Sequence, residues 1–290
     1  MPEYVIFTDA TVDLTDAFVE SEKIGILPME YTMDGATYTY CRDWKEEQYK
    51  DFYAQLRAGK VATTSQITPF VYATTFEPVL QSGKDVLYIC FSSGLSGTIE
   101  SARLVASDLM EKYPGRKVIC VDSLGATFGE GLAVITAAQK RAEGADIETC
   151  AKWVEDNLQH NCHWFTVDDL MFLKRGGRIS ATTAIVGSAL QIKPVMHMDK
   201  EGHLIPVEKV RGRKLSLKGI ANRMKETAIH PEEQEVYIGH GDSLEDAEAL
   251  ASRIREIMPV RNIYIAPLSP IIGSHSGPGT IALFFLGTQR

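Results

Sequence analysis

The sequence predicts an α/β protein of two domains, and three observations lead to this prediction. Short runs that are apolar at nearly every position recur along the chain, and helix-like stretches lie between them. At 290 residues, 44% of them hydrophobic, the chain is also long enough to bury two cores. Strands that are apolar on both faces belong to sheets covered on both sides, and such sheets are usually parallel. The alternation of strands and helices therefore predicts two α/β domains with mainly parallel sheets.

The expected strands are short and the expected helices are amphipathic. We expect strands at residues 4–7, 86–91, 117–121, 235–239, 262–266 and 281–285. We expect helices at residues 97–112, 129–142, 146–159 and 243–258, in which apolar residues recur three and four positions apart. At the start of the last helix, Ser243 and Asp246 have the spacing of a capping box.

The alternation of strands and helices changes near residue 160, which predicts a domain boundary there. The segment 193–210, KPVMHMDKEGHLIPVEKV, predicts a β-hairpin whose turn is Asp199–Gly202. We therefore expect an N-terminal α/β domain over residues 1–160 and a C-terminal α/β domain over residues 161–280. The final strand, within residues 281–290, is a candidate to return to the first domain.

The charge of the chain disfavours nucleic acid as its main partner. The formal net charge is −8 and the pI is about 5.5, whereas binding to phosphates relies on a basic surface. The basic cluster Lys209–Lys218 is a local exception. The same charge balance, with no helix-turn-helix signature, also disfavours a sensor that acts on DNA.

Cysteine and histidine spacing predicts a reduced protein without a metal. The five cysteines form no CxxC pair. The HNCH segment at residues 160–163 lacks a second ligand pair at suitable spacing, so we expect no metal there. The N-terminal segment has no basic n-region, and no apolar run approaches the length of a membrane span. We therefore expect a cytoplasmic protein.

Hydroxyl-rich and glycine-rich loops follow several of the predicted strands. An example is SSGLSGT at residues 92–98. Two similar segments are ATTSQITP at 62–69, in the loop before another helix, and GSHSGPGT at 273–280, the last loop of the chain. Ligands of parallel α/β sheets bind outside the carboxyl ends of the strands, where hydroxyls and backbone amides suit a small polar or anionic group. Serine, threonine and glycine are also ordinary turn and capping residues. Because several loops of one chain share this composition, we favour a binding site.

A serine esterase is the alternative interpretation of the SSGLSGT loop. Residues 94–98, GLSGT, nearly match the GxSxG elbow, and Ser96, Asp168 or Asp169, and His275 follow one another in hydrolase order. Thr98 stands where the motif has its final glycine, and a threonine would crowd the cramped turn around a nucleophile. The chain has neither GxxxxGK[ST] nor a GxGxxG after a strand, so we expect no nucleotide cofactor.

Five segments in series resemble the DegV family of bacterial lipid-binding proteins. They are TDATVDLT, TTSQITP, SSGLSGT, KRGGRIS and GSHSGPGT, and they extend from Thr8 to Thr280. Some members of the family, called FakB, carry a fatty acid to a separate kinase. The resemblance implies that one long-chain fatty acid lies in an apolar tunnel of the C-terminal domain, with its carboxylate near the crevice between the domains. It further implies no cofactor, no catalytic activity of the chain itself, and a fatty acid kinase subunit as partner.

The resemblance also implies which residues hold the carboxylate. Thr64 and Ser96 look like its hydroxyl partners, and His275 looks like a third member of the same network. Arg211 is similar to an arginine that supports this network or faces the kinase. Three further candidates are Ser65, Ser92 and Ser93. Ile67 and Thr68 separate TSQ from proline, where the family often has none, so the shape of that loop departs from the family's pattern.

Elementary energetics agree with a fatty acid as ligand. Each buried CH₂ is worth roughly 0.8 kcal/mol, so about a dozen methylenes give on the order of 10 kcal/mol before costs. A buried carboxylate must be paired or hydrogen-bonded, and hydroxyl and amide donors meet that need. Candidates for the tunnel wall, which could equally be ordinary core, are Ala184, Ile185, Val186, Leu190 and Ile192. Transient contact with a membrane surface is a further expectation.

The KRGGRIS segment at residues 174–180 has two interpretations. It is either a helix that ends at glycine, with basic residues that complement the helix dipole, or a patch that docks a partner. The sequence leaves both open.

Overall fold

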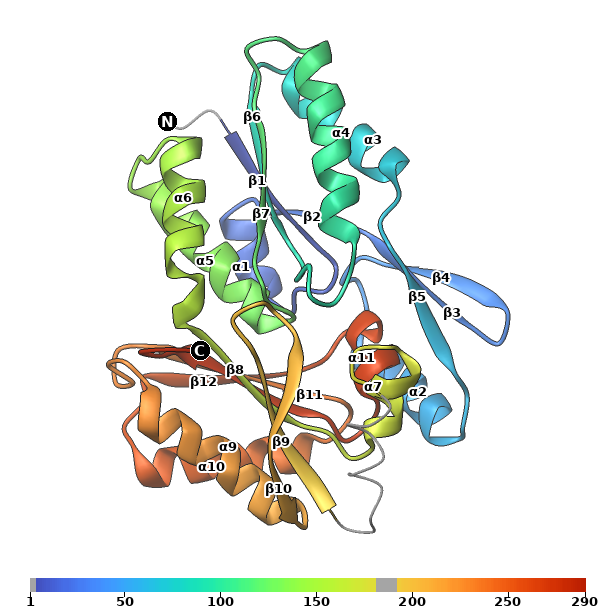
Figure 1. Ribbon diagram of the computed structural model, residues 1–290, viewed down its shortest axis with the longest axis vertical. Coiled ribbons are helices and arrows are strands. Elements are labelled where there is room, and N and C mark those ends of the chain that lie inside the picture. The colour runs from blue at the N-terminus through green and yellow to red at the C-terminus, as the bar shows by residue number, and fades with distance from the viewer. Residues whose placement is uncertain (1–3, 181–191) are drawn as a thin grey trace.

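The computed structural model describes residues 4–180 and 192–290 and arranges them around three β-sheets (Figure 1). A four-stranded sheet and its helices form the upper lobe of Figure 1, and a six-stranded sheet forms the lower lobe. A three-stranded sheet lies beside them. This mixed α/β architecture, with helices packed on a parallel sheet, confirms the predicted fold class.

The four-stranded sheet is wholly parallel, in the order β2-β1-β6-β7. Its strands are β1 (Tyr4–Asp9), β2 (Gly25–Leu27), β6 (Asp85–Cys90) and β7 (Val118–Asp122). Val86 and Tyr88 join the core on one face, and Leu87 and Ile89 join the core on the other. The covering helices are α3 (Pro69–Gln81), α4 (Thr98–Lys112), α5 (Phe128–Ala142) and α6 (Ile147–Asn157). Burial of both faces is the reason that these strands are apolar at nearly every position.

The three-stranded sheet is antiparallel and was not expected from the sequence. It has the order β4-β3-β5. Its strands are β3 (Met29–Met33), β4 (Ala36–Tyr40) and β5 (Ala62–Ser65). Helices α1 (Asp16–Ser21) and α2 (Glu46–Arg57) belong to the same part of the chain. On β3, Met29, Tyr31 and Met33 are buried and alternate with more exposed residues, so only one face of this sheet meets the core.

The six-stranded sheet has the order β10-β9-β8-β13-β11-β12. Its strands are β8 (Asn161–Thr166), β9 (Ile192–Met198), β10 (Leu204–Arg211), β11 (Glu235–His240), β12 (Asn262–Pro267) and β13 (Ile281–Leu286). The associated helices are α7 (Leu170–Arg175), α9 (Arg213–Thr227), α10 (Leu244–Ile257) and α11 (Pro270–Ser276), and the one-turn 3₁₀ helix Leu158–His160 precedes β8. Helices α9 and α10 share one core with Trp164 and Leu283, while Phe128 of α5 packs on the other face with Phe165.

The expectation of mainly parallel strands is wrong for the six-stranded sheet. Only β11 and β12 pair in parallel, and the other neighbours are antiparallel. An apolar run reports that both faces of a strand are buried, but it does not report the direction of its neighbours. Strands joined by a tight turn, such as β9 and β10, must be antiparallel because a parallel pair needs a long crossover.

The expectation that the last strand returns to the first domain is also wrong. Strand β13 lies inside the six-stranded sheet, between β8 and β11. Its register places Ile281 opposite Thr166 of β8 and opposite His240 of β11. An apolar strand is equally suited to the centre of either sheet, so its choice of partner depends on contacts far away in the sequence.

Local predictions agree more closely with the structure. Helices α4, α5, α6 and α10 begin and end within two residues of the expected bounds. The β9–β10 hairpin turns at Asp199, whose carboxylate accepts hydrogen bonds from the backbone N–H groups of Glu201 and His203. Ser243 is the N-cap residue of α10, but its hydroxyl donates to Asp246 rather than closing a capping box. None of the described helices combines the length and the hydropathy needed to cross a membrane.

Candidate functional site

A cavity lies between the parallel sheet and the six-stranded sheet. The volume of this cavity is about 230 Å³. Its wall takes residues from the loops after β6 and β7, from the end of β5, from α7 and α11, and from strands β8, β9 and β13. Most of the wall is apolar, with Leu173, Met198, Leu204, Ile271 and Phe284 among its members. One group of polar side chains interrupts this apolar wall.

The centre of this polar group is a hydrogen bond between Thr64 and His275. Thr64 Oγ1 lies 2.7 Å from His275 Nε2, and both side chains line the cavity. Thr64 is on β5, and His275 is near the end of the short helix α11, which starts at Pro270 and is capped by Ser269. The fold therefore joins two segments that are 211 positions apart in the sequence.

His275 is uncharged at neutral pH. Burial lowers its pKa to about 4, and the nearby Arg178 guanidinium contributes to this fall. Its second ring nitrogen, Nδ1, is buried without a hydrogen-bond partner among the described residues. This nitrogen lies against Gly176, where an added Cβ would come within 2.3 Å of it. The site thus requires a residue without a side chain at position 176.

The loop after β6 brings Ser96 to the same cavity. Ser96 Oγ lies 3.1 Å from Thr98 Oγ1 and accepts a hydrogen bond from the Thr98 N–H at 3.3 Å. A Cβ on Gly97 would come within 2.9 Å of Gln66 Nε2, so this loop lies close against the segment that follows β5. Ser65 and Gln66 of that segment line the cavity together with Ser96. Thr64, Ser65, Ser96 and His275 are therefore gathered around one space.

Ser92, Ser93 and Arg211 lie outside the wall of this cavity, unlike the other four candidates. Ser92 is buried, and its hydroxyl donates to the Gly202 carbonyl at 2.9 Å, which ties the loop to the turn of the β9–β10 hairpin. Ser93 is exposed, and its backbone N–H donates to Asp122. Arg211 is exposed at the end of β10. Of the three serines in this loop, Ser96 lines the cavity and Ser92 and Ser93 do not.

Arg178 is a member of the site that the sequence analysis missed. It is half-buried, lines the cavity, and its guanidinium donates to the carbonyl of Gly176. Burial lowers its pKa, although an arginine so placed remains a cation at neutral pH. The sequence signal that could have identified Arg178 is the segment KRGGRIS. In this segment Gly176 is the C-cap residue of α7, and Gly177 has a positive φ of 74°. The turn at these two glycines reverses the direction of the chain and brings Arg178 to the cavity wall.

Of the candidates for the tunnel wall, Ile192 is the one that lies within the described residues. Ile192 is half-buried on β9 but is not part of the lining. Ala184, Ile185, Val186 and Leu190 lie outside the described residues. Phe165, Met198, Ala282 and Phe284 line the cavity instead, and they come from three strands of the six-stranded sheet. An apolar sequence run does not show which face of a strand meets the cavity.

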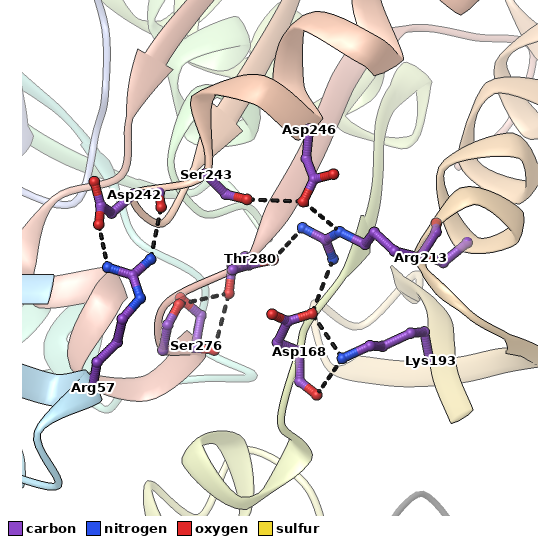
Figure 2. A network of polar contacts seen from close by, with 12 residues as sticks. Arg57, Asp168, Lys193, Arg213, Asp242, Ser243, Asp246, Ser276 and Thr280 are labelled. Atoms are coloured by element: carbon purple, nitrogen blue, oxygen red, sulfur yellow. Dashed lines mark hydrogen bonds and ion pairs between the residues drawn. The ribbon is translucent and has the colours of Figure 1, made fainter. Parts of the chain in front are cut away.

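The residues of the esterase alternative are engaged in other contacts. Figure 2 shows Asp168 between Lys193 and Arg213, and its carboxylate lies 2.8 Å from Lys193 Nζ. Asp169 caps α7 by accepting the N–H of Met171 at 2.8 Å. His275 is bonded to Thr64 rather than to Ser96. The nucleophile–base and base–acid hydrogen bonds of a triad are thus not formed within the described residues.

The same polar network holds the loop that carries His275. Thr280 Oγ1 donates to the carbonyls of Ser276 and Gly277, both at 2.9 Å (Figure 2). Arg213 donates to the carbonyl of Gly279 and forms an ion pair with Asp246. These contacts close the segment between α11 and β13 and fix the end of the helix that positions His275.

The HNCH segment makes its contacts within the fold. His160 Nδ1 lies 2.9 Å from the carbonyl of Gly287, the Cys162 thiol contacts the carbonyl of Gln289, and His163 Nδ1 lies 3.0 Å from Met198 Sδ. Within residues 4–180 and 192–290, the one group of side chains spaced for a metal is His230, Glu232 and Glu233, all of them exposed. Exposed acidic groups of this kind are common without an ion.

Comparison with known proteins identifies the family. The family model described as "Uncharacterised protein, DegV family" matches residues 3–288. The chain belongs to the DegV family. It is 42% identical to a DegV domain-containing protein of Clostridium perfringens, over 100% of this chain and 99% of that protein. The resemblance drawn from the five sequence segments is therefore confirmed.

Solved structures of DegV proteins have the same fold. A DegV family protein from Thermus thermophilus, described with fatty acid binding, has a TM-score of 0.86 and 30% identity, over 98% of this chain and 99% of that one. A DegV lipid-binding protein from Thermotoga maritima has a TM-score of 0.85 and 27% identity, over the whole of both chains.

Proposed function

We propose that this protein binds one long-chain fatty acid in the cavity and presents the carboxylate to a separate fatty acid kinase. The observation that carries the proposal is the Thr64–His275 hydrogen bond, set beside Ser96 and Arg178 in an otherwise apolar cavity. Fatty acid binding by one DegV protein of known structure and lipid binding by another support it. The chain would act as a carrier, without a cofactor or catalytic chemistry of its own.

The polar group suits a carboxylate better than a neutral head group. Neutral His275 can donate its Nε2–H to Thr64 Oγ1, which leaves the Thr64 hydroxyl hydrogen free for the ligand. Ser96 offers a second hydroxyl, and Arg178 supplies the cation that a partly buried anion needs. The apolar wall would hold the acyl chain, at roughly 0.8 kcal/mol for each buried CH₂.

The kinase partner is inferred from the family resemblance. Phosphorylation of the carboxylate by a separate enzyme requires that the polar end of the cavity be reached from outside, and Ser96 and His275 are only partly buried. We further propose a cytoplasmic location, with transient contact at the membrane surface when the ligand is exchanged.

Extraction of the purified protein tests the ligand. The protein would be denatured and extracted with organic solvent, and the extract analysed by mass spectrometry. We expect one long-chain fatty acid per chain, or uptake of labelled oleate or palmitate by protein that is purified empty. An empty extract with no uptake would overturn the proposal, and hydrolysis of a p-nitrophenyl ester that is lost in Ser96→Ala would favour the esterase.

A reconstituted transfer assay tests presentation to the kinase. A bacterial fatty acid kinase, ATP and the loaded protein should form acyl phosphate, and Ser96→Ala should slow this reaction. Ser93→Ala is the matched control because Ser93 lies on the same loop but is exposed outside the cavity. Equal rates for both variants and the unaltered protein would contradict the assignment of Ser96.

A further inference from the structure

Two buried carboxyl groups lie below the loop that carries Ser96. Asp9 ends β1 and Glu130 is in the first turn of α5, and both are fully buried. The hydroxyl of Thr11 connects them, since Thr11 Oγ1 lies 2.5 Å from Asp9 Oδ1 and 2.5 Å from Glu130 Oε2. Neither carboxyl is paired with a lysine, arginine or histidine among the residues that the structure describes.

Counting hydrogens shows that one of these groups must be protonated. The Thr11 hydroxyl has one hydrogen and can donate it to only one carboxylate. The contact between Thr11 and the second carboxyl group is also 2.5 Å long, so it needs a hydrogen that does not come from Thr11. The other donors near Glu130 are the Thr8 hydroxyl, which is bonded to the other oxygen, Oε1, and the backbone N–H of Asp9, and neither can supply the hydrogen between Thr11 Oγ1 and Oε2. The missing hydrogen therefore belongs to a carboxyl group.

The surrounding donors place that hydrogen on Glu130. Asp9 accepts the N–H of Thr11 at 3.0 Å, the N–H of Phe91 at 3.1 Å and the O–H of Tyr88 at 3.1 Å. Such donors stabilise a carboxylate, and Asp9 has one more of them than Glu130, which is bonded by the Thr8 hydroxyl and the backbone N–H of Asp9 besides Thr11. Burial raises the pKa of both groups and hydrogen-bond donors oppose the rise at both, but the charge of Asp9 raises the pKa of Glu130 further.

The other titratable groups that face this pair are uncharged at neutral pH. From β6 they are Tyr88 and Cys90, whose pKa values burial raises. From β8, His163 packs against Gly129, next to Glu130, and burial lowers its pKa. The pair therefore carries its single negative charge without a compensating cation nearby.

Asp9 holds the start of the Ser96 loop directly. It binds the N–H of Phe91, directly before the loop, and the hydroxyl of Tyr88. The Tyr88 hydroxyl also packs 3.3 Å from that of Tyr72, which donates to the carbonyl of Thr98, directly after Ser96 and Gly97. Because each tyrosine hydroxyl has already donated its one hydrogen, this second link is a packing contact. Thr11 itself lines the cavity. The geometry of the loop thus depends on the charge and position of Asp9.

We propose that Asp9 and Glu130 share a single proton through the Thr11 hydroxyl, with the proton on Glu130 and the charge on Asp9, and that this pair positions the loop that carries Ser96. The sharing of the proton does not depend on the ligand. The positioning role rests on the proposed fatty acid site.

Infrared spectroscopy tests the sharing of the proton in the full chain. We expect Glu130→Gln to lose the C=O stretching band of a protonated carboxyl at pH 7, because glutamine has the shape and the hydrogen-bonding groups of the neutral acid. Asp13→Asn is the control, since burial raises the pKa of Asp13 to about 8 and this group contributes its own band. A Glu130→Gln spectrum that loses a carboxylate band instead would overturn the proposal.

The pH dependence of stability gives a second readout. The raised pKa of folded Glu130 means that the native state holds a proton that the unfolded chain releases above its ordinary value of 4.5. Stability of the unaltered protein should therefore fall as pH rises from that value towards the folded pKa. We expect the melting temperature of Glu130→Gln, relative to the unaltered protein, to rise between pH 5 and pH 9. A constant or falling difference contradicts a protonated Glu130.

Fatty acid affinity tests the positioning role. Glu130→Ala removes the donor to Thr11, and we expect the affinity to fall about tenfold. Glu130→Gln should restore most of that loss at neutral pH. If both variants weaken binding equally, Glu130 does not act through its hydrogen bond and the positioning role is wrong. If the unaltered protein binds no fatty acid at all, the proposed function fails while the infrared and pH results still decide the sharing of the proton.

Asp9 provides the last check. Asp9→Asn is expected to keep the Glu130 band but to weaken fatty acid binding more than Glu130→Gln does. Should this variant fail to fold, Tyr88→Phe removes one donor to Asp9 while leaving the ring in the core, and it is expected to weaken binding in the same direction. The role assigned to Asp9 would be contradicted if Asp9→Asn folds and binds fatty acid normally and if Tyr88→Phe also leaves the affinity unchanged.

Discussion

The segment Gly273–Thr280 is held by two polar clusters that use charge differently. On the cavity side, neutral His275 is bonded to Thr64, and Arg178 is the nearby cation. On the outer side, Arg213 joins Asp168 and Asp246, which are 48% and 34% exposed at their side chains (Figure 2). One cluster is mainly neutral and buried, and the other is ionic and partly solvated.

The difference between the clusters follows from the cost of removing charge from water. A partly exposed ion pair keeps much of its hydration, so it costs little to form and contributes little to stability. A buried histidine loses its proton instead, because desolvation disfavours the charged form. Arg178, the one arginine or lysine among the described residues of the cavity wall, is then available to an anionic ligand.

Replacement of Arg178 should cause the largest loss of binding. Arg178→Met removes the cation from the cavity, and we expect fatty acid affinity to fall about 30-fold or more, because a partly buried anion then has no charged partner. Titration calorimetry with oleate measures the change. Arg175→Met is the matched control, since Arg175 belongs to the same segment but is exposed. Similar losses of affinity in both variants would contradict the role of Arg178 as the cation that binds the carboxylate.

Acid should destabilise the protein through His275. The pKa of His275 in the folded protein is about 4, below the ordinary value of 6.5. Between these two pH values, the unfolded chain therefore binds a proton that the native state does not bind. Stability should therefore fall as pH decreases from about 6.5 to about 4, and it should be insensitive to this group above that range. Urea unfolding at several pH values checks this.

His275→Gln is the variant that isolates this effect, because glutamine does not titrate. Its free energy of unfolding, compared with that of the unaltered protein, should improve as pH falls through the same range. A difference that stays constant with pH would show that His275 is not held neutral in the folded state.

Thr64→Val should have an intermediate effect on binding. Valine keeps the shape of threonine but loses the hydroxyl, and a single hydrogen bond to a charged group is worth about tenfold in affinity. Thr63→Val is the matched control, because Thr63 is the preceding residue of β5 and is exposed. Oleate binding monitored by calorimetry separates them. Loss in the Thr63 variant alone would reverse the assignment of the two faces of β5.

Asp168→Asn should have the smallest effect. The Asp168–Lys193 pair is partly exposed, so we expect the free energy of unfolding to change by less than about 1 kcal/mol and the change to shrink at high salt. Fatty acid affinity should stay the same. A large loss of affinity would show that the outer cluster, and not only the cavity side, governs the ligand site.

Much of the local structure could be predicted because it depends on neighbouring residues. Burial on both faces makes β6 apolar throughout, and helix α4 shows apolar residues three and four positions apart. The hairpin turn at Asp199 follows from short-range hydrogen bonds and a glycine with positive φ. The residues that the family resemblance implied for the carboxylate were read from motifs, and four of them line one cavity.

Other features could not be predicted because they depend on which segments meet. The pairing of β13 with β8 and β11 involves strands that are far apart in the chain, and its apolar composition suits several positions. Arg178 was missed because only the turn after α7 brings it to the cavity. Serines of one loop also looked alike, although Ser92 faces the hairpin and Ser96 faces the cavity.

The α/β class, the positions of the main helices and the family follow from composition, periodicity and motifs, which are properties of short segments. The direction of the strands in the six-stranded sheet, the bond between Thr64 and His275, and the burial of Asp9 beside Glu130 become visible in the folded chain alone. These features arise from contacts between distant segments. Desolvation then decides which of the groups in contact keep their charge, and it acts only once the chain has folded.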